Sequence, residues 1–301
     1  MIRLLSIVGL LAVVACGRSS TTPAGLRCAN DREFCPGACN PQGYCEQDLG
    51  WGPEVRVPKG TYVVFFRGRL SDGMEESSLV TFPSSYWIDK REMSVGLAKK
   101  CGDCGVTSIE ADTQPAQVTR AQAVAVCAAG GRRLPSNYEW EAAGRGPTIC
   151  TDPAQLHPKD PTCNGRVFPW TVVYADPEDI CARALIEDCG KPTGPRPVAD
   201  HPEGASPIGV QEMIGNVTEW ISNIEQVIGW ASYTKEDRGI VKGGDWATAG
   251  EAHSFAYVTL IIREYRKPDK LSGLRCVRGP FIDVRAKLRP SAFDDPPEDA
   301  R

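Results

Sequence analysis

Alternating apolar and polar positions predict the first strands of the chain. Residues 55–66 alternate on either side of Pro58-Lys59-Gly60, which indicates a strand, a turn and a second strand rich in aromatic and β-branched residues. Residues 86–95 read as a further extended segment. We expect the main domain to begin with these strands, near Trp51.

Two capping boxes predict two helices. Thr119 and Gln122 have the spacing at which a cap side chain and the residue three positions later each accept a backbone N–H of the other. Ser136 and Glu139 repeat this spacing. The first helix continues through an Ala- and Val-rich interior and ends at Gly130-Gly131, where the absence of a side chain favours a helix stop.

Residues 211–220, QEMIGNVTEW, predict a turn that leads into an ordered loop. A helix would place three apolar residues on one face: Met213, Val217 and Trp220. Gly215 and Asn216 in the middle of so short an element disfavour that helix by about 1 kcal/mol or more. Two carboxylates, Glu212 and Glu219, flank the pair, and oxygen ligands of this kind suit a hard cation such as Ca²⁺.

Four blocks of sequence together resemble the formylglycine-generating enzyme family, also called the sulfatase-modifying-factor domain. They are GRRLPSNYEWE (131–141), QEMIGNVTEW (211–220), VKGGDW (241–246) and SGLRCVRG (272–279). VRVPKGTYVV (55–64) and SSYWIDKREMSVG (84–96) are similar to two further family blocks. The resemblance implies an α+β fold over residues 51–280, a loop-rich and disulfide-stapled variant of the C-type lectin fold.

The resemblance also implies a structural calcium site. The side chains of Glu212 and Glu219 and the carbonyls of Gly215 and Val217 would supply its ligands. A second calcium site of the family follows its FPW-like block, and its Ala-Asn segment is not recognisable after Phe168.

The catalytic cysteines of the family have no counterpart in this chain. The two positions that hold Cu(I) in family members fall on Thr248 and His253. A threonine hydroxyl and one imidazole cannot replace a bis-thiolate copper site, so we expect neither copper binding nor the oxidase reaction. One family disulfide maps to Cys127 and Cys276, which are both present, and the other to Gly144 and Val258, which are not cysteines.

The N-terminus predicts a bacterial lipoprotein. Residues 1–15 carry Arg3 and an apolar core too short to span a bilayer, as in a signal peptide. Val13-Val14-Ala15-Cys16 resembles a lipobox, so we expect lipid on Cys16 as the membrane anchor. An ordinary secretory signal is the alternative. An aspartate after the lipidated cysteine would indicate retention in the inner membrane. Positions 17 and 18 hold no aspartate, so we favour the outer membrane as the location.

The other cysteines indicate an oxidising compartment. Of 13 cysteines, setting Cys16 aside leaves 12, an even number. After a tether (16–27), residues 28–50 form a small cysteine-rich module for which we favour two disulfides over a Zn²⁺ site. Cys101 and Cys104 have the C-x-x-C spacing of redox-active thioredoxins, but we favour a structural disulfide between them. Local pairing is expected for four more cysteines: Cys150 with Cys163, and Cys181 with Cys189.

Charge and histidine content narrow the functional classes. The net charge is −4, and the sequence has no basic stripe of the kind that binds nucleic acid. His157, His201 and His253 make no H-x-x-x-H pair, which argues against the ergothioneine-type relatives and their histidine iron site. Residues 281–301 have few apolar positions and are expected to be a disordered tail.

The sequence therefore predicts an envelope lipoprotein that binds a protein, peptide or glycan without catalysis. The candidate groove contains Asp245, Trp246 and His253, where relatives bind substrate. The alternative is a formylglycine-generating oxidase or other modifying enzyme with a rearranged site. A third hypothesis is an envelope spacer, in which the groove residues have no role.

Overall fold

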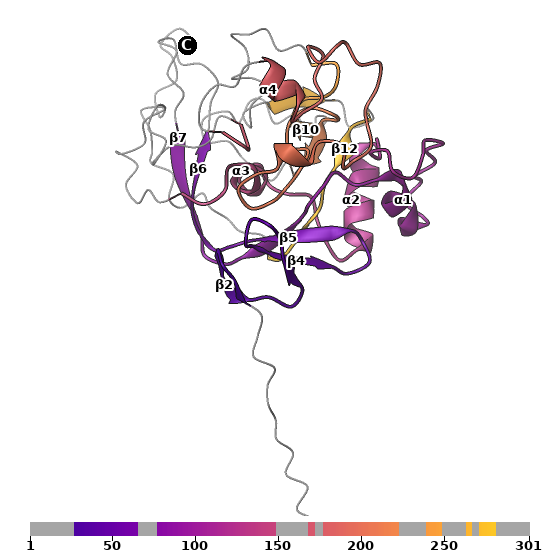
Figure 1. The fold of residues 1–301 in the computed structure, drawn as a ribbon. Helices are drawn as coiled ribbons and strands as arrows, with labels where there is room; N and C mark the ends of the chain where they lie inside the picture. The colour runs from indigo at the N-terminus through magenta and orange to yellow at the C-terminus, as the bar shows by residue number, and fades with distance from the viewer. Residues whose placement is uncertain are drawn as a thin grey trace, which may run out of the picture.

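The computed structural model describes residues 27–65, 77–148, 168–171, 177–222, 239–248, 263–266 and 271–280. Short helices and short strands alternate with long loops in these segments, so the predicted α+β fold is confirmed (Figure 1). Several predictions concern residues outside the described ones: the predicted signal peptide at 1–15, Cys16, the predicted pair of Cys150 and Cys163, His157, His253 and the predicted tail at 281–301.

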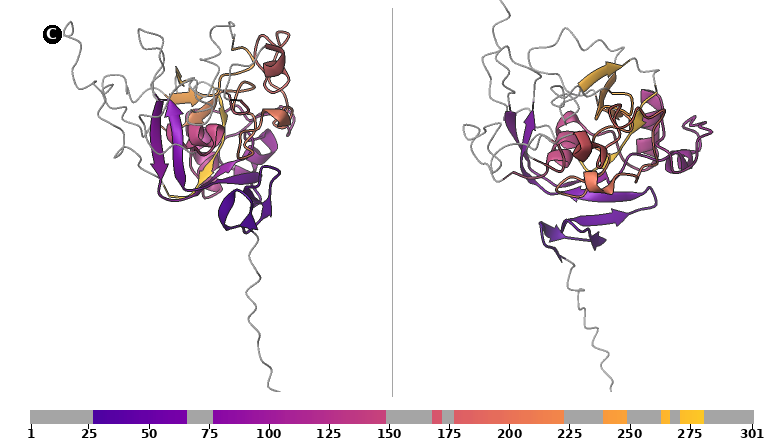
Figure 2. Two further views of the ribbon diagram at one scale, coloured as in Figure 1. Left: turned by 60° about the vertical axis from the view of Figure 1, so that its left-hand side comes forward. Right: turned by 45° about the horizontal axis from the view of Figure 1, so that its top comes forward.

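A five-stranded antiparallel sheet has the order β13-β8-β5-β4-β3. Its strands are β3 (Ala38–Cys39), β4 (Cys45–Asp48), β5 (Pro53–Val57), β8 (Tyr86–Asp89) and β13 (Val277–Arg278). Because β3 and β4 belong to it, the cysteine-rich segment extends the sheet of the main domain (Figure 2). Arg56 Nε donates to buried Asp31 Oδ2 over 2.7 Å and adds an ion pair across the predicted boundary near residue 51.

A second sheet has four strands in the order β11-β10-β9-β12. They are β9 (Glu219–Ile221), β10 (Gly239–Lys242), β11 (Arg263–Arg266) and β12 (Gly273–Leu274). Only β12 and β9 pair in parallel among these described strands. Residues 211–218 form a loop that enters β9, so the sequence rightly disfavoured a helix here; we call residues 211–220 the Gly-Asn loop.

Two hairpins complete the strands. The first pairs β6 (Gly60–Phe65) with β7 (Ser77–Phe82), and the second pairs β1 (Arg27–Cys28) with β2 (Asp31–Phe34). The predicted strands on either side of Pro58 thus lie in different sheets, because β6 pairs with β7, a strand that the sequence did not indicate.

The helices are short. They are α1 (Val95–Ala98), α2 (Arg120–Ala129), α3 (Asn137–Arg145) and α4 (Pro177–Cys181), with 3₁₀ turns at η1 (Lys99–Cys101) and η3 (Pro202–Gly204). Both predicted capping boxes are present, at Thr119 and at Ser136. The predicted extended segment at 86–95 is correct only as far as Asp89, because the Ser94 side chain caps α1.

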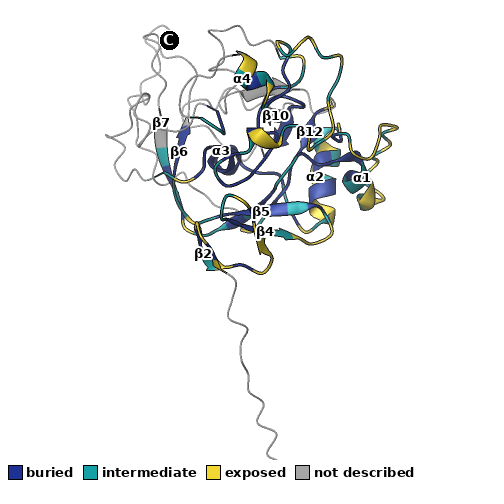
Figure 3. Cartoon of the chain, in the orientation of Figure 1, coloured by how far each residue is buried: buried dark blue, intermediate teal, exposed yellow. Residues whose placement is uncertain are grey.

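The core surrounds α3, in which every residue is buried (Figure 3). Trp140 on α3 packs with Tyr62 and Tyr86 in one apolar cluster, and Trp220 on β9 belongs to a second. The two tryptophans are completely buried.

Five disulfides staple the described segments. They are Cys28–Cys39, Cys35–Cys45, Cys101–Cys104, Cys127–Cys276 and Cys181–Cys189. The bridge that the resemblance implies between Cys127 and Cys276 ties α2 to the C-terminal strands across 149 residues. Disulfides persist in oxidising compartments, which supports an extracytoplasmic location. Among the described residues, no helix has the length and apolar character needed to cross a membrane.

Candidate functional site

The segment after β10 forms a closed turn. Gly243 and Gly244 have φ values of +92° and +72°, a region that favours glycine because it has no Cβ. The Thr248 hydroxyl donates to Asp245 Oδ1 over 2.9 Å, and the Asp245 N–H donates to Thr248 Oγ1 over 2.9 Å. The threonine side chain therefore closes the turn.

Two backbone hydrogen bonds hold this turn against the Gly-Asn loop. The Trp246 N–H donates to the Asn216 carbonyl over 3.1 Å, and the Gly215 N–H donates to the Gly243 carbonyl over 2.9 Å. Trp246 is half-buried, so part of its indole is accessible to a ligand. The structure thus places Asp245 and Trp246 on one surface, whereas His253 is not described.

A buried ion pair fixes the far end of the Gly-Asn loop. Arg275 Nη2 and Nε donate to the two Glu219 carboxylate oxygens over 2.7 and 2.8 Å. Trp140 Nε1 donates to Glu219 Oε2 over 2.7 Å. Burial by itself would lower the pKa of Arg275, but the attraction and hydrogen bond of Glu219, together with the attraction of Glu92 and Asp89, outweigh it, and the pKa is raised.

The same guanidinium also satisfies main-chain acceptors. Arg275 Nη1 donates to the Asp89 carbonyl over 2.9 Å. Its Nη2 donates to the carbonyls of Gln211 and Glu212 over 2.9 and 3.2 Å. One side chain therefore connects β8, the Gly-Asn loop and β9.

A third carboxylate, Glu92, supports the middle of the loop. Glu92 Oε2 accepts from Asn216 Nδ2 over 2.6 Å, and Oε1 accepts from the Val217 N–H over 3.2 Å. Burial, followed by repulsion from Glu212 and Glu219, raises the pKa of Glu92. Arg275 therefore attracts both Glu219 and Glu92, although only Glu219 accepts hydrogen bonds from it.

Glu212 is the least satisfied of these acids. It has a left-handed φ of 52°, and its Oε1 accepts from the His201 N–H over 2.9 Å. Its buried Oε2 has no hydrogen-bond partner within the described part of the chain and lies 3.6 Å from His201 Nδ1. This Glu212 carboxylate raises the pKa of His201.

These features fit the calcium site that the resemblance implies. Glu212 Oε2 has no hydrogen bond and lies 3.6 Å from His201 Nδ1, so this carboxylate oxygen keeps acceptor positions of the kind that a hard cation prefers. Glu219 is less available because Arg275 and Trp140 occupy three of its acceptor positions, but a carboxylate can accept about four hydrogen bonds.

Comparison with known proteins identifies the family. The model described as "Sulfatase-modifying factor enzyme 1-like domain" matches residues 54–280. The chain belongs to this family. The match begins in β5 and ends just after β13, so the four-stranded sheet and the candidate site lie within it, whereas β3 and β4 of the five-stranded sheet precede it.

Curated relatives of this sulfatase-modifying-factor family include active and inactive enzymes. Hercynine oxygenase from Mycolicibacterium thermoresistibile is 30% identical over 162 residues, which cover 48% of this chain and 32% of the relative. "Inactive C-alpha-formylglycine-generating enzyme 2" from Bos taurus is 26% identical over 167 residues, 52% of this chain and 46% of the relative. The chain therefore spans between about a third and a half of the length of these relatives.

Solved structures share the fold. PvdO from Pseudomonas aeruginosa superposes with a TM-score of 0.56 at 19% identity, covering 76% of this chain and 95% of that protein. CarF gives a TM-score of 0.50 at 18% identity, with 76% and 98% covered. At such identities the likeness establishes the fold alone.

The sequence did not indicate the partners that hold the site. Glu92 and Arg275 lie inside blocks that resemble the family, but their roles were not inferred from them. No local signal singles them out, because Glu92 follows three charged residues at 89–91 and the block of Arg275 contains a second arginine, Arg278.

We predict that Glu219→Gln lowers the free energy of unfolding by about 3–5 kcal/mol, because it leaves Arg275 buried without its counter-charge. Urea unfolding measures the loss. The double variant Glu219→Leu with Arg275→Met should recover only part of it, because Arg275 also donates to the carbonyls of Asp89, Gln211 and Glu212. As a control, Arg196→Gln breaks an exposed pair with Asp200 and should change stability by less than about 1 kcal/mol. An equally small effect of Glu219→Gln would contradict the central role of this pair.

Proposed function

We propose that this chain is a lipid-anchored, non-catalytic member of the sulfatase-modifying-factor family. It binds a protein, peptide or glycan through the surface that includes Asp245, Trp246 and His253. The observation that carries the proposal is the closed turn at Thr248, the position at which family oxidases have their first copper-binding cysteine.

The turn supports a binding role in two ways. The Thr248 hydroxyl is already engaged with Asp245, so it has a structural use in place of a reactive one. The same turn presents a half-buried tryptophan, and tryptophans of this kind often supply much of the binding energy at interfaces. A relative whose name states that it is inactive is consistent with a family that keeps the scaffold without the reaction.

Anchoring through Cys16 places this surface outside the cytoplasm. The lipobox-like residues 13–16 support the anchor, and the disulfides of the described segments support an oxidising compartment. The proposed location is the outer membrane, and the cysteine-rich segment lies between the lipid and the main domain in the sequence.

Calcium has a structural role in this proposal. Glu212 and Glu219, with the carbonyls of Gly215 and Val217, would hold the ion. The ion would stabilise the loop against which the Trp246 turn is packed.

We predict that Ca²⁺ raises the melting temperature of the EGTA-treated mature protein. A free concentration 100 times the dissociation constant stabilises a folded protein by about 2.7 kcal/mol. Glu212→Gln should remove most of the shift, and the same concentration of Mg²⁺ should give a smaller one because Mg²⁺ gives up its waters reluctantly. Identical melting with Ca²⁺ and with EGTA would exclude the site.

The binding proposal is tested by screening the mature protein on a glycan array and a peptide library. We predict specific hits, and Trp246→Ala should weaken them by about 30-fold or more, which corresponds to a hot-spot residue. Trp170→Ala is a matched control, because Trp170 is also half-buried but stacks on Phe168 and donates its Nε1 to Asp179. A screen without specific hits, or hits whose affinity Trp246→Ala leaves unchanged, would refute the proposal that this surface binds the ligand.

A further inference from the structure

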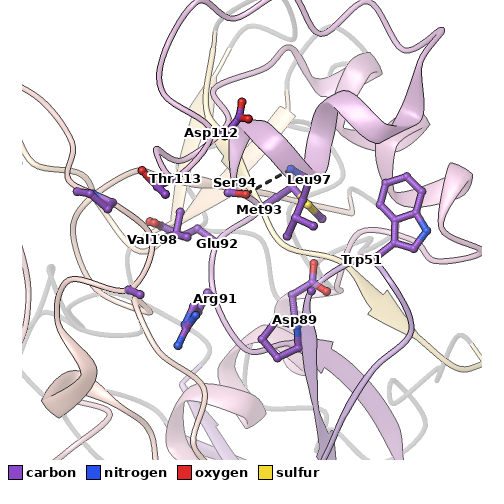
Figure 4. Close-up of a pocket in the computed structure, with 14 residues that line it drawn as sticks. Trp51, Asp89, Arg91, Glu92, Met93, Ser94, Leu97, Asp112, Thr113 and Val198 are labelled. Atoms are coloured by element: carbon purple, nitrogen blue, oxygen red, sulfur yellow. Dashed lines mark hydrogen bonds between the residues drawn. The ribbon is translucent and has the colours of Figure 1, made fainter.

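A disulfide with C-x-x-C spacing joins the 3₁₀ turn η1, which directly follows α1, to the next loop. Cys101, the last residue of η1, is bonded to Cys104 across a sequence separation of 3, the smallest among the five described bridges. The start of α1 is held by the Leu97 N–H, which donates to Ser94 Oγ over 3.3 Å (Figure 4). The bridge therefore continues from an element that is fixed at its other end.

This bridge contributes less to the stability of the fold than the longer ones. In the chain-entropy model a disulfide stabilises the protein by restricting the unfolded chain, and the effect increases with the length of the closed loop. Cys101–Cys104 closes a separation of 3, whereas Cys127–Cys276 closes 149. The protein can therefore keep its fold when Cys101–Cys104 opens, as a disulfide that exchanges in the native state requires.

The bridge is also accessible. Cys101 and Cys104 are both half-buried, whereas Cys127 and Cys276 are completely buried. Exchange begins when a thiolate attacks one sulfur of a disulfide, so accessible bridges are the labile ones. An external thiol can reach Cys101–Cys104 without unfolding of the chain.

The surroundings of the two sulfurs differ. Cys101 Sγ lies 3.8 Å from the Ala125 carbonyl oxygen on α2. If the bridge opens, the S–H of Cys101 can donate to this carbonyl, which stabilises a reduced Cys101. Cys104 is followed by Gly105, whose carbonyl accepts from Gln122 Nε2 over 2.6 Å. These contacts favour an opened state in which Cys101 is the released thiol and Cys104 carries the partner.

A groove of about 360 Å³ begins at Gly105, the residue bonded to Cys104. Its apolar lining includes two exposed side chains, Ile109 and Leu271. Within the described part of the chain, the main-chain N–H groups of residues 106–109 make no hydrogen bond. An extended peptide can pair with such a segment through main-chain hydrogen bonds and place alternate side chains against the apolar lining. The groove thus suits a peptide that ends beside Cys104.

We propose that Cys101–Cys104 is an exchangeable disulfide that oxidises two thiols on a peptide segment of a partner protein bound in this groove. A partner thiolate attacks Cys104 Sγ and forms a mixed disulfide. The bond between Cys101 and Cys104 breaks, and its electron pair leaves on Cys101 Sγ, which takes up a proton.

The second partner thiolate completes the exchange. It attacks the partner sulfur of the mixed disulfide and releases Cys104, which takes up a proton in turn. Two electrons and two protons thus pass from the partner dithiol, which becomes a disulfide, to Cys101 and Cys104. An oxidising compartment keeps the resting bridge closed, which sets this direction. The reaction uses neither copper nor oxygen and consumes the bridge, so it is distinct from the family oxidase reaction.

The first test measures how readily the bridge opens in the folded protein. The mature protein is treated with dithiothreitol under native conditions, new thiols are alkylated, and the labelled cysteines are identified by mass spectrometry. Cys101 and Cys104 should be labelled about tenfold or more faster than Cys181 and Cys189, a matched pair that is also half-buried but closes a longer loop. Equal labelling of the two pairs would overturn the proposal.

The second test asks whether a peptide dithiol is oxidised without copper or oxygen. The probe is the peptide Val-Thr-Val-Cys-Gly-Gly-Cys, compared with the same peptide in which serine replaces both valines. Mass spectrometry should show that the valine peptide loses two hydrogens about tenfold or more faster, because its side chains bury apolar area in the groove. No oxidation of either peptide, or equal rates for the two, would contradict a bound partner.

A pair of surface variants tests the groove. Ile109→Ser should slow oxidation of the valine peptide about tenfold or more, and its side chain is 97% exposed, so the fold should not change. Val124→Ser is the matched control, because Val124 is exposed on α2 outside the groove lining and should leave the rate unchanged. Equal rates in the two variants would rule out the groove.

Single-cysteine variants assign the two sulfurs. With the oxidised valine peptide, Cys101→Ser should trap a mixed disulfide at Cys104, because no second thiol can release it. Cys104→Ser should trap far less at Cys101. The reverse preference would contradict the assignment. None of these experiments involves the Trp246 surface, so their failure is distinguishable from failure of the proposed function.

Discussion

The bidentate contact between Arg275 and Glu219 connects parts of the chain that are far apart in sequence. Glu219 begins β9, Trp140 donates to it from α3, and Arg275 lies between β12 and β13. A buried ion pair is tolerated only when its geometry is close to ideal and nearly all of its hydrogen bonds are made. The backbone segments that carry Arg275 and Glu219 therefore have little freedom to move. The conformation of the Gly-Asn loop follows from this constraint.

The Trp246 turn is packed against that loop. Asn216 accepts the Trp246 N–H through its carbonyl and donates through its side chain to buried Glu92. One residue therefore connects the turn to the buried acids behind it.

Local rules predicted the parts of the structure that depend on neighbouring residues. The capping boxes at Thr119 and Ser136 and the loop around Gly215 follow from short-range chemistry that the sequence displays directly. The pairing of β8 with β13 and of β9 with β12 joins strands that lie far apart in the sequence, which no local pattern encodes. For the same reason Glu212 and Glu219 were recognised as candidate ligands, whereas their neighbours Glu92 and Arg275 were not.

The central claim is that this chain keeps the family scaffold without the copper oxidase reaction. The most direct test is mass spectrometry of a Cys-x-Pro-x-Arg peptide incubated with oxygen and copper-treated mature protein, shown beforehand to be folded and disulfide-bonded. The account predicts that the peptide thiol is not converted to an aldehyde. Turnover would contradict it and would show that groups other than Thr248 and His253 carry out the reaction.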